Sequence, residues 1–123
     1  MLDVLVVEED APTRFCFKEL LRLEGYSVTV AEDAGIGLEK ARGHKLIILS
    51  AGFGGEEALR FLKERSRFEE ISQIPTIVTS TSFLESHEEV LRFPNIVDFL
   101  YKPFAIDDFI KKVKVILLVE TSQ

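Results

Sequence analysis

The chain has almost no cysteine, and it lacks long apolar runs. Cys16 is its single cysteine, so no disulfide can form within the chain, which is typical of proteins in reducing compartments. No apolar stretch approaches the roughly 20 residues that a membrane-spanning helix needs. The first residues, MLDVLVVEED, lack the basic start and the longer apolar segment of a signal peptide. We therefore expect a cytoplasmic protein that does not enter membranes.

Positive charge is in the minority. Lys and Arg number 15 against 21 Asp and Glu, which gives a formal net charge of −6. Proteins bind nucleic acid through Lys and Arg that displace counterions from phosphates, so this composition argues against direct nucleic-acid binding. Hydrophobic residues make up 46% of the 123 residues and charged residues 29%, which is typical of a globular protein. At this length we expect a single domain spanning residues 1–121.

Short apolar segments with the character of strands occur at residues 2–7, 26–30, 46–49, 76–79 and 96–100. Runs such as VLVV, LIIL and PTIV are apolar on both faces, as strands buried between two layers of helices must be. Segments with helical spacing separate them, and the one at 84–92 is poorly patterned and should be short. This strict alternation predicts an α/β fold of the (βα)5 type, a doubly wound parallel five-stranded sheet with helices on both faces.

The last helical segment has the clearest pattern. Its apolar residues at i, i+3/i+4 and i+7 spacing should form one buried stripe, made of Ile106, Phe109, Ile110, Val113, Ile116 and Leu117. Val115, Leu118 and Val119 fall on the other side of this helix and are candidate interface residues. Either a protein partner uses this patch, or an attached output domain of a longer protein packs against it.

The cysteine and the histidines offer no catalytic or metal-binding pattern. Cys16 is expected to be a small buried residue of the first helix. His44 and His87 are isolated on segments expected to be exposed, without metal-ligand spacing. Because neither histidine follows a strand end, we expect no Ser-His-Asp triad and no enzyme activity.

Polar residues gather where the strands end. Glu8, Glu9 and Asp10 follow the first strand, Ser50 the third, Ser80 the fourth, and Lys102 the fifth. In parallel sheets of this class the functional site lies at the carboxyl ends of the strands. Carboxylates suit Mg²⁺ and a lysine suits phosphate, so the pattern is that of a cation-plus-phosphate site. The alternative is that the three acids only cap the first helix, where its dipole favours negative charge.

In order along nearly the whole chain, VVEED with Arg14, LIILS, IPTIVTS and YKPF resemble the signatures of response regulator receiver domains of the CheY-like type. The resemblance implies the flavodoxin-like strand order 2-1-3-4-5 and a role in two-component signal transduction, or phosphorelay. It also implies positions for the site: Glu8, Glu9 and the backbone carbonyl of Gly52 for Mg²⁺, Ser50 for the phosphate-accepting aspartate, Ser80 and Lys102 for phosphate contacts, and Phe99 for the aromatic switch.

Two departures from the family pattern suggest that phosphotransfer has been lost. A serine hydroxyl at position 50 needs a base to become a nucleophile, whereas a carboxylate is already ionised at neutral pH. The loop SAGFGGEE has no proline and enters its helix early, and Lys45 stands where the family commonly has an acid. With one carboxylate fewer, Mg²⁺ should bind weakly, and no cofactor should be required. Lys102 should then pair with Glu8 or Glu9.

The sequence therefore predicts an atypical receiver, or pseudo-receiver, that acts independently of aspartyl phosphorylation. It would bind a protein partner or form a homodimer through the face made by the fourth helix, the fifth strand and the last helix. One alternative is a receiver phosphorylated at an unconventional acceptor, Ser50 or Glu9. Another is a receiver that senses a small ligand at the rim.

Overall fold

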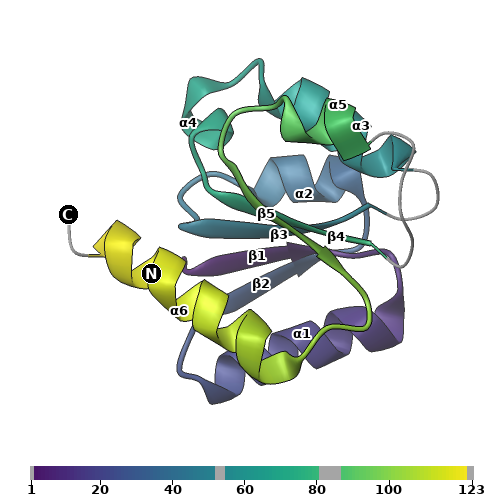
Figure 1. The fold of residues 1–123 in the computed structure, drawn as a ribbon. Coiled ribbons are helices and arrows are strands. Elements are labelled where there is room, and N and C mark those ends of the chain that lie inside the picture. Colours follow the sequence, from purple (N-terminus) through teal and green to yellow (C-terminus); the bar gives the residue numbers. More distant parts are fainter. Residues whose placement is uncertain (1, 52–54, 81–86, 122–123) are drawn as a thin grey trace.

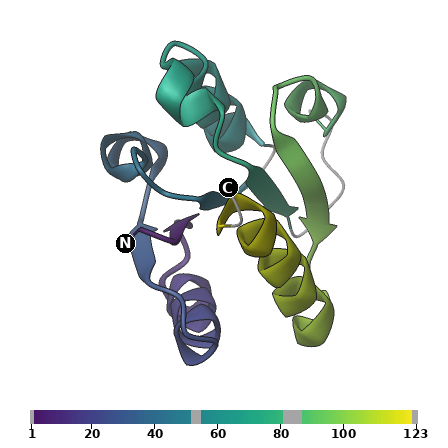
Figure 2. The ribbon, with the colours of Figure 1, turned by 90° about the vertical axis from the view of Figure 1, so that its left-hand side faces the viewer.

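The computed structural model describes residues 2–51, 55–80 and 87–121. Its strands form one parallel sheet in the order β2-β1-β3-β4-β5, which confirms the predicted fold class and strand order. Helices α1 and α6 lie on one side of this sheet, and α2 and α3 lie on the other (Figures 1 and 2). None of the described helices combines the length and the apolarity required to cross a bilayer.

The elements follow the alternation that the sequence predicts. The strands are β1 (Val4–Val7), β2 (Val28–Ala31), β3 (Leu46–Ser50), β4 (Thr76–Ser80) and β5 (Ile96–Tyr101). The helices are α1 (Ala11–Leu23), α2 (Ala34–Lys40), α3 (Glu56–Arg65), α4 (Glu69–Ser72), α5 (His87–Leu91) and α6 (Ile106–Thr121). The short α5 is expected from its weak pattern, whereas the single turn α4 is not predicted.

The two faces of the sheet carry separate apolar cores. In β1, Leu5 and Val7 pack toward α2 and α3, while Val4 and Val6 pack toward α1 and α6. Every residue of β1 is buried, as its apolar sequence VLVV predicts. The strand register places Val7 beside Leu49, so β1 and β3 end together at the same edge of the sheet.

Gly37 allows helix α2 to pack closely against Val7 of β1 and Phe61 of α3. A Cβ atom added at this glycine would lie 2.8 Å from a methyl carbon of Val7 and 3.2 Å from the ring of Phe61. Gly35 lies two residues earlier in the same helix. A Cβ atom added there would have only a carboxylate oxygen of Asp33 nearby, at 3.4 Å. Gly37 is therefore required by packing, while Gly35 is not.

Three sequence predictions about burial are wrong. Cys16 is exposed because the buried face of α1 is set by Phe17 and Leu21. His44 is only 5% exposed, since its ring bonds the carbonyl of Ala41 and, at 2.9 Å, the hydroxyl of Thr29. Ile106 is 53% exposed because α6 begins at this residue, beyond the end of the buried stripe that Phe109, Val113 and Leu117 form.

Arg65, at the end of α3, is fully buried. Its guanidinium donates hydrogen bonds to the carbonyl of Ile74, to Thr76 Oγ1 at 2.8 Å, and to the carbonyl of Pro94. Burial lowers the pKa of Arg65 to about 10. The side chain thus joins α3 to the start of β4 and to the turn before β5.

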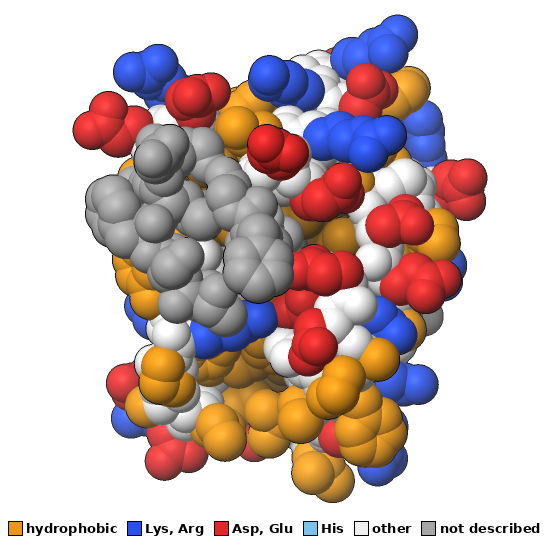
Figure 3. All heavy atoms as spheres, turned by 90° about the vertical axis from the view of Figure 1, so that its right-hand side faces the viewer, with side chains coloured by type: hydrophobic (Ala, Val, Ile, Leu, Met, Phe, Trp, Pro, Cys, Tyr) orange, Lys and Arg blue, Asp and Glu red, His pale blue; other side chains and the backbone are white. Residues whose placement is uncertain are grey.

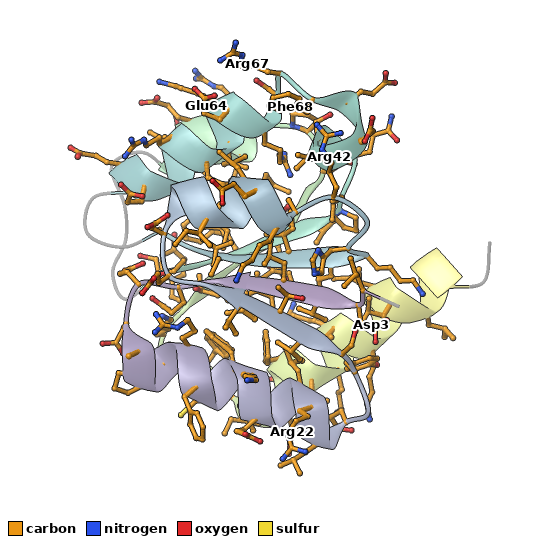
Figure 4. All side chains as sticks on the ribbon, turned by 180° about the vertical axis from the view of Figure 1, so that it is seen from behind. Asp3, Arg22, Arg42, Glu64, Arg67 and Phe68 are labelled. Atoms are coloured by element: carbon orange, nitrogen blue, oxygen red, sulfur yellow. The ribbon has the colours of Figure 1, made fainter. Side chains whose placement is uncertain are left out.

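A further cationic contact lies on the back of the molecule. Arg42 is placed over the ring of Phe68, with 5.3 Å from its guanidinium carbon to the ring centroid, and both residues are labelled in Figure 4. The Arg42 guanidinium also lies 2.7 Å from a carboxylate oxygen of Glu70. This exposed contact links the segment that follows α2 with helix α4.

Candidate functional site

The carboxyl ends of the strands bring the predicted site residues to one rim. Glu8 follows β1, Ser50 ends β3, Ser80 ends β4 and Lys102 follows β5. Glu8, Ser50 and Ser80 are 2%, 6% and 2% exposed, so their side chains lie within the rim rather than on the surface. Figure 3 views this rim, where acidic side chains gather above a group of hydrophobic ones.

Glu8 and Lys102 form an ion pair across the rim. Lys102 Nζ lies 2.8 Å from Glu8 Oε1, which confirms the prediction that Lys102 pairs with one of the first two acids. The other carboxylate oxygen of Glu8 accepts the backbone N–H of Asp10, and the main-chain N–H of Lys102 donates to Ser80 O at 2.6 Å. The Lys102 ammonium also lies 5.7 Å from the ring centroid of Phe17. These contacts hold both charged groups in place.

The other two acids of the EED run have different surroundings. Asp10 caps α1, because its carboxylate accepts the backbone N–H of Thr13 at 3.1 Å. The hydrogen bonds from Thr13 hold the pKa of Asp10 below its usual value. Glu9 is exposed as a residue, but the pKa of its carboxyl is raised. Partial burial of the carboxyl is the main cause, and repulsion from Glu8 adds to it. The helix-capping interpretation therefore applies to Asp10 alone.

A cavity of about 310 Å³ opens beside Ser50. Its charged lining comprises Glu9, Glu32, Asp33, Glu57 and Arg60. Within the part of the chain that the structure describes, no group of three or more potential ligands is arranged to hold a metal ion. Gly52, the expected source of a metal-binding carbonyl, lies outside the described residues.

Thr79 is a rim residue that the sequence did not single out. It lies next to Ser50 in the β3–β4 register and is fully buried. Its Oγ1 has no hydrogen-bond partner among the described residues. The signal was present in the run IPTIVTS, in which a second hydroxyl residue directly precedes Ser80.

The structure separates the expected switch and interface residues: Phe99 and Val115 lie on the β5 side of the molecule, whereas Leu118 lines a hollow with Asp3 and Tyr26. Phe99 is half-buried in β5, with its ring 5.1 Å from that of Tyr101. Val115 and Leu118 are 63% and 70% exposed, as expected for residues outside the buried stripe of α6. The side chain of Val119 lies outside the described residues.

The family described as the response regulator receiver domain matches this chain over residues 4–114. The chain belongs to this family. It is thus a receiver domain of the kind that serves two-component signal transduction. The KDP operon transcriptional regulatory protein KdpE of Escherichia coli is 30% identical over 119 residues, which are 95% of this chain and 52% of KdpE. The receiver domain therefore spans about half the length of that relative.

Solved structures share the receiver fold over nearly their whole length. The chemotaxis protein CheY4 of Vibrio cholerae superimposes with a TM-score of 0.82 at 22% identity, covering 95% of this chain and 99% of that one. The receiver domain of the sensor histidine kinase PA1611 of Pseudomonas aeruginosa gives a TM-score of 0.79 at 20% identity, covering 94% and 97%. The latter structure contains a magnesium ion coordinated in its active-site cleft.

Proposed function

We propose that this receiver domain works without aspartyl phosphorylation, as a pseudo-receiver that binds a protein partner or a second copy. The observation that carries the proposal is the Glu8–Lys102 ion pair, at a rim where the central strand β3 ends in Ser50. By the family resemblance, Ser50 stands at the position of the phosphate acceptor. Lys102 stands at the position of the phosphate-binding lysine, and its charge is already balanced within the fold.

The chemistry of Ser50 supports the loss of phosphotransfer. Attack on a phosphoryl group would require removal of the hydroxyl proton, and the product would be a stable phosphate ester rather than a labile acyl phosphate. Ser50 as a residue is only 6% exposed, which also disfavours approach by a large phosphodonor such as a phosphohistidine domain. A reversible histidine-to-serine relay is therefore disfavoured on both counts.

The rim fits a Mg²⁺ ion poorly. Glu8 is engaged by Lys102, and an ammonium beside a carboxylate opposes the binding of a second cation there. Ser50 offers a neutral oxygen instead of a carboxylate. Mg²⁺ favours charged oxygen ligands in octahedral geometry, so we expect weak binding.

Intact-mass analysis tests the proposal. The protein is incubated with acetyl phosphate and Mg²⁺, and its intact mass is measured by mass spectrometry before and after. A conventional receiver is the positive control. We expect no phosphate adduct. A stoichiometric adduct would contradict the proposal, and its loss in Ser50→Ala or in Glu9→Gln would identify an unconventional acceptor.

The partner-binding surface is proposed to be the face formed by α5, β5 and α6. Val97 and Val115 are 47% and 63% exposed there, and a groove of about 310 Å³ lies between β5 and α6. Asp98 and Lys112 form an ion pair at this groove. An apolar strip with charged edges is typical of a protein interface. Substitution of Val115 by lysine should abolish partner binding and leave the melting temperature unchanged.

A further inference from the structure

The sheet has two outer strands, and each has backbone groups that face away from the sheet. In the order β2-β1-β3-β4-β5, the strands β2 and β5 pair on one side only. Figure 2 shows the green strand β5 at the outer edge, with α5 and α6 on either side of it. An open strand edge can bind a strand of another chain, which leads to strand addition or aggregation unless the edge is blocked. In this chain, two charged side chains occupy outward backbone groups.

At the β5 edge, the side chain of Asp98 occupies the outward N–H of Phe99. The main-chain N–H of Lys102 donates to Ser80 O, so Lys102 points toward β4. Because alternate residues of a parallel strand bond to the same neighbour, Leu100 and Asp98 also turn their backbone toward β4, whereas Phe99 turns outward. The Phe99 N–H donates to Asp98 Oδ1 at 2.8 Å. This outward donor is thus bonded within its own strand.

Lys112 of α6 holds the Asp98 carboxylate in this position. Its ammonium bonds the second carboxylate oxygen, Asp98 Oδ2, so the two oxygens have different partners. The hydrogen bond to Asp98 raises the pKa of Lys112, so the ammonium stays charged at neutral pH. An ionised carboxylate is a stronger acceptor for a backbone N–H than a neutral group. The side chains of Asp98 and Lys112 are 30% and 42% exposed, so either can be replaced without opening the core.

At the β2 edge, the side chain of Lys40 occupies an outward C=O. The N–H of Glu8 donates to Ala31 O, so Ala31 turns toward β1 and Val30 turns outward. Lys40 is the last residue of α2 and is exposed. Its Nζ donates to Val30 O at 2.9 Å. The two edges of the sheet are therefore occupied in complementary ways, a donor by an acid at β5 and an acceptor by a lysine at β2.

We propose that Asp98 and Lys40 close the two edges of the sheet against a strand from another chain. Each side chain occupies a backbone group that an added strand would need for its own hydrogen bonds. An incoming strand would have to displace a charged group from its hydrogen bond and bury it beside the new strand, which is costly. A partner of the α5–β5–α6 face must therefore bind side chains rather than extend the sheet. The closure is independent of whether the rim accepts phosphate.

Amide hydrogen exchange of the full chain, followed by NMR in dilute solution, tests the β5 contact. Phe99 and Val30 both turn their N–H outward, and of these two Phe99 has the carboxylate acceptor. Relative to intrinsic rates, we expect the Phe99 amide to exchange at least about tenfold more slowly than the Val30 amide. Asp98→Ala should abolish this difference, while the Lys102 amide, which bonds Ser80 O, should be unaffected. Equal protection of Phe99 and Val30 in the parent, or no change of the Phe99 rate in Asp98→Ala, would overturn the proposal.

Opening both edges tests the consequence for assembly. The double variant Asp98→Ala/Lys40→Met should self-associate at least about tenfold more strongly than the parent in sedimentation velocity. At least one of the two outward amides should then become protected as the concentration rises, because an added strand would bond it, whereas a dimer of helix faces would leave both unchanged. Asp107→Ala/Lys63→Met is the matched control, since it removes the same charges from α6 and α3, and circular dichroism checks the folding of all samples. The proposal is equally overturned if the double variant associates no more strongly than this control, or if both amides stay unprotected in the associated protein.

Discussion

Glu8 and Lys102 are separated by 94 residues in the chain, and their charged groups lie 2.8 Å apart at the rim of the sheet. The side chains are 2% and 20% exposed, so water screens the pair only weakly. An ion pair in such a setting contributes little over two matched neutral groups, but loss of one partner leaves the other charge buried. The two residues must therefore be tested together.

Lys102→Met should destabilise the protein by about 3 kcal/mol, because the Glu8 carboxylate would lose its counter-charge in a buried site. Glu8→Gln should also destabilise the protein, because the ammonium of Lys102 would lose its counter-charge. The double variant should regain much of that loss. Urea denaturation of the four proteins measures the coupling between the residues, and strictly additive losses would show that the pair does not act as a unit.

Ser50→Asp should make stability depend on Mg²⁺. A third carboxylate beside Glu8 and Glu9 raises the repulsion among acids at the rim and also supplies a charged ligand for the cation. We expect the variant to melt below the parent in the absence of Mg²⁺ and to gain more than the parent when the ion is added. Ser50→Asn is the matched control, since it has nearly the same shape without the charge. An equal response of both variants to Mg²⁺ would contradict the role assigned to charge.

Gly37→Ala should destabilise the protein even though alanine is the better helix former. The added methyl group would lie 2.8 Å from a Val7 methyl carbon, and overpacking of this kind costs about 1–3 kcal/mol. Gly35→Ala, in the same helix, should be neutral or stabilise by up to about 1 kcal/mol. Thermal denaturation of the two variants gives the comparison, and similar shifts for both would argue against the close approach of α2 to β1.

His44 should make the protein less stable in mild acid. Burial is the main cause that holds the pKa of His44 below its ordinary value of 6.5, so the folded state favours the neutral ring. The unfolded chain binds the proton more readily, and stability is therefore complete above about pH 6.5 and decreases as the pH falls below it. His44→Gln should remove this part of the pH dependence. Urea midpoints at several pH values measure it, and parallel profiles for the two proteins would refute the assignment.

Two buried threonines of β4 should respond in opposite ways to replacement by valine. Thr79 Oγ1 has no hydrogen-bond partner among the described residues, so Thr79→Val removes an unsatisfied buried hydroxyl and should be neutral or stabilise the protein. Thr76 Oγ1 accepts from Arg65 and donates to the carbonyl of Ile74. Thr76→Val should cost about 2 kcal/mol, because the buried guanidinium loses an acceptor. The midpoints of urea denaturation of the two variants, compared with the parent protein, test both expectations.

The strands and their carboxyl-end residues could be predicted because they depend on short stretches of sequence. Apolar runs mark β1, β3 and β4, and a polar residue directly after each run must lie at the same edge of a parallel sheet. The Glu8–Lys102 pair was expected from the family resemblance, which places Lys102 at the rim beside a neutral Ser50; in the strand order itself, β3 and β4 lie between β1 and β5. Only the choice between Glu8 and Glu9 needed the structure.

Burial set by distant contacts could not be predicted. In the run EEALRFLKER, Arg65 has the sequence context of a surface residue, and its acceptors lie 9, 11 and 29 residues further along the chain. His44, in the loop before β3, bonds the hydroxyl of Thr29, which lies in β2. The exposure of Cys16 follows from a rotation of about 100° per helical residue, once Phe17 is known to face the core. These errors concern side-chain orientation and leave the topology unchanged.

The strand order also bears on how the molecule assembles. Because β1 lies between β2 and β3, the first three strands in the chain can pair with one another before β4 and β5 join them. Lys102 can reach Glu8 only when the last strand is in place, and a contact between such distant residues carries a large loop-closure cost. The pair should therefore form after the rate-limiting step of folding. Its removal would then accelerate unfolding while leaving the folding rate nearly unchanged. Lys102 would thus act chiefly by lowering the unfolding rate of the folded domain.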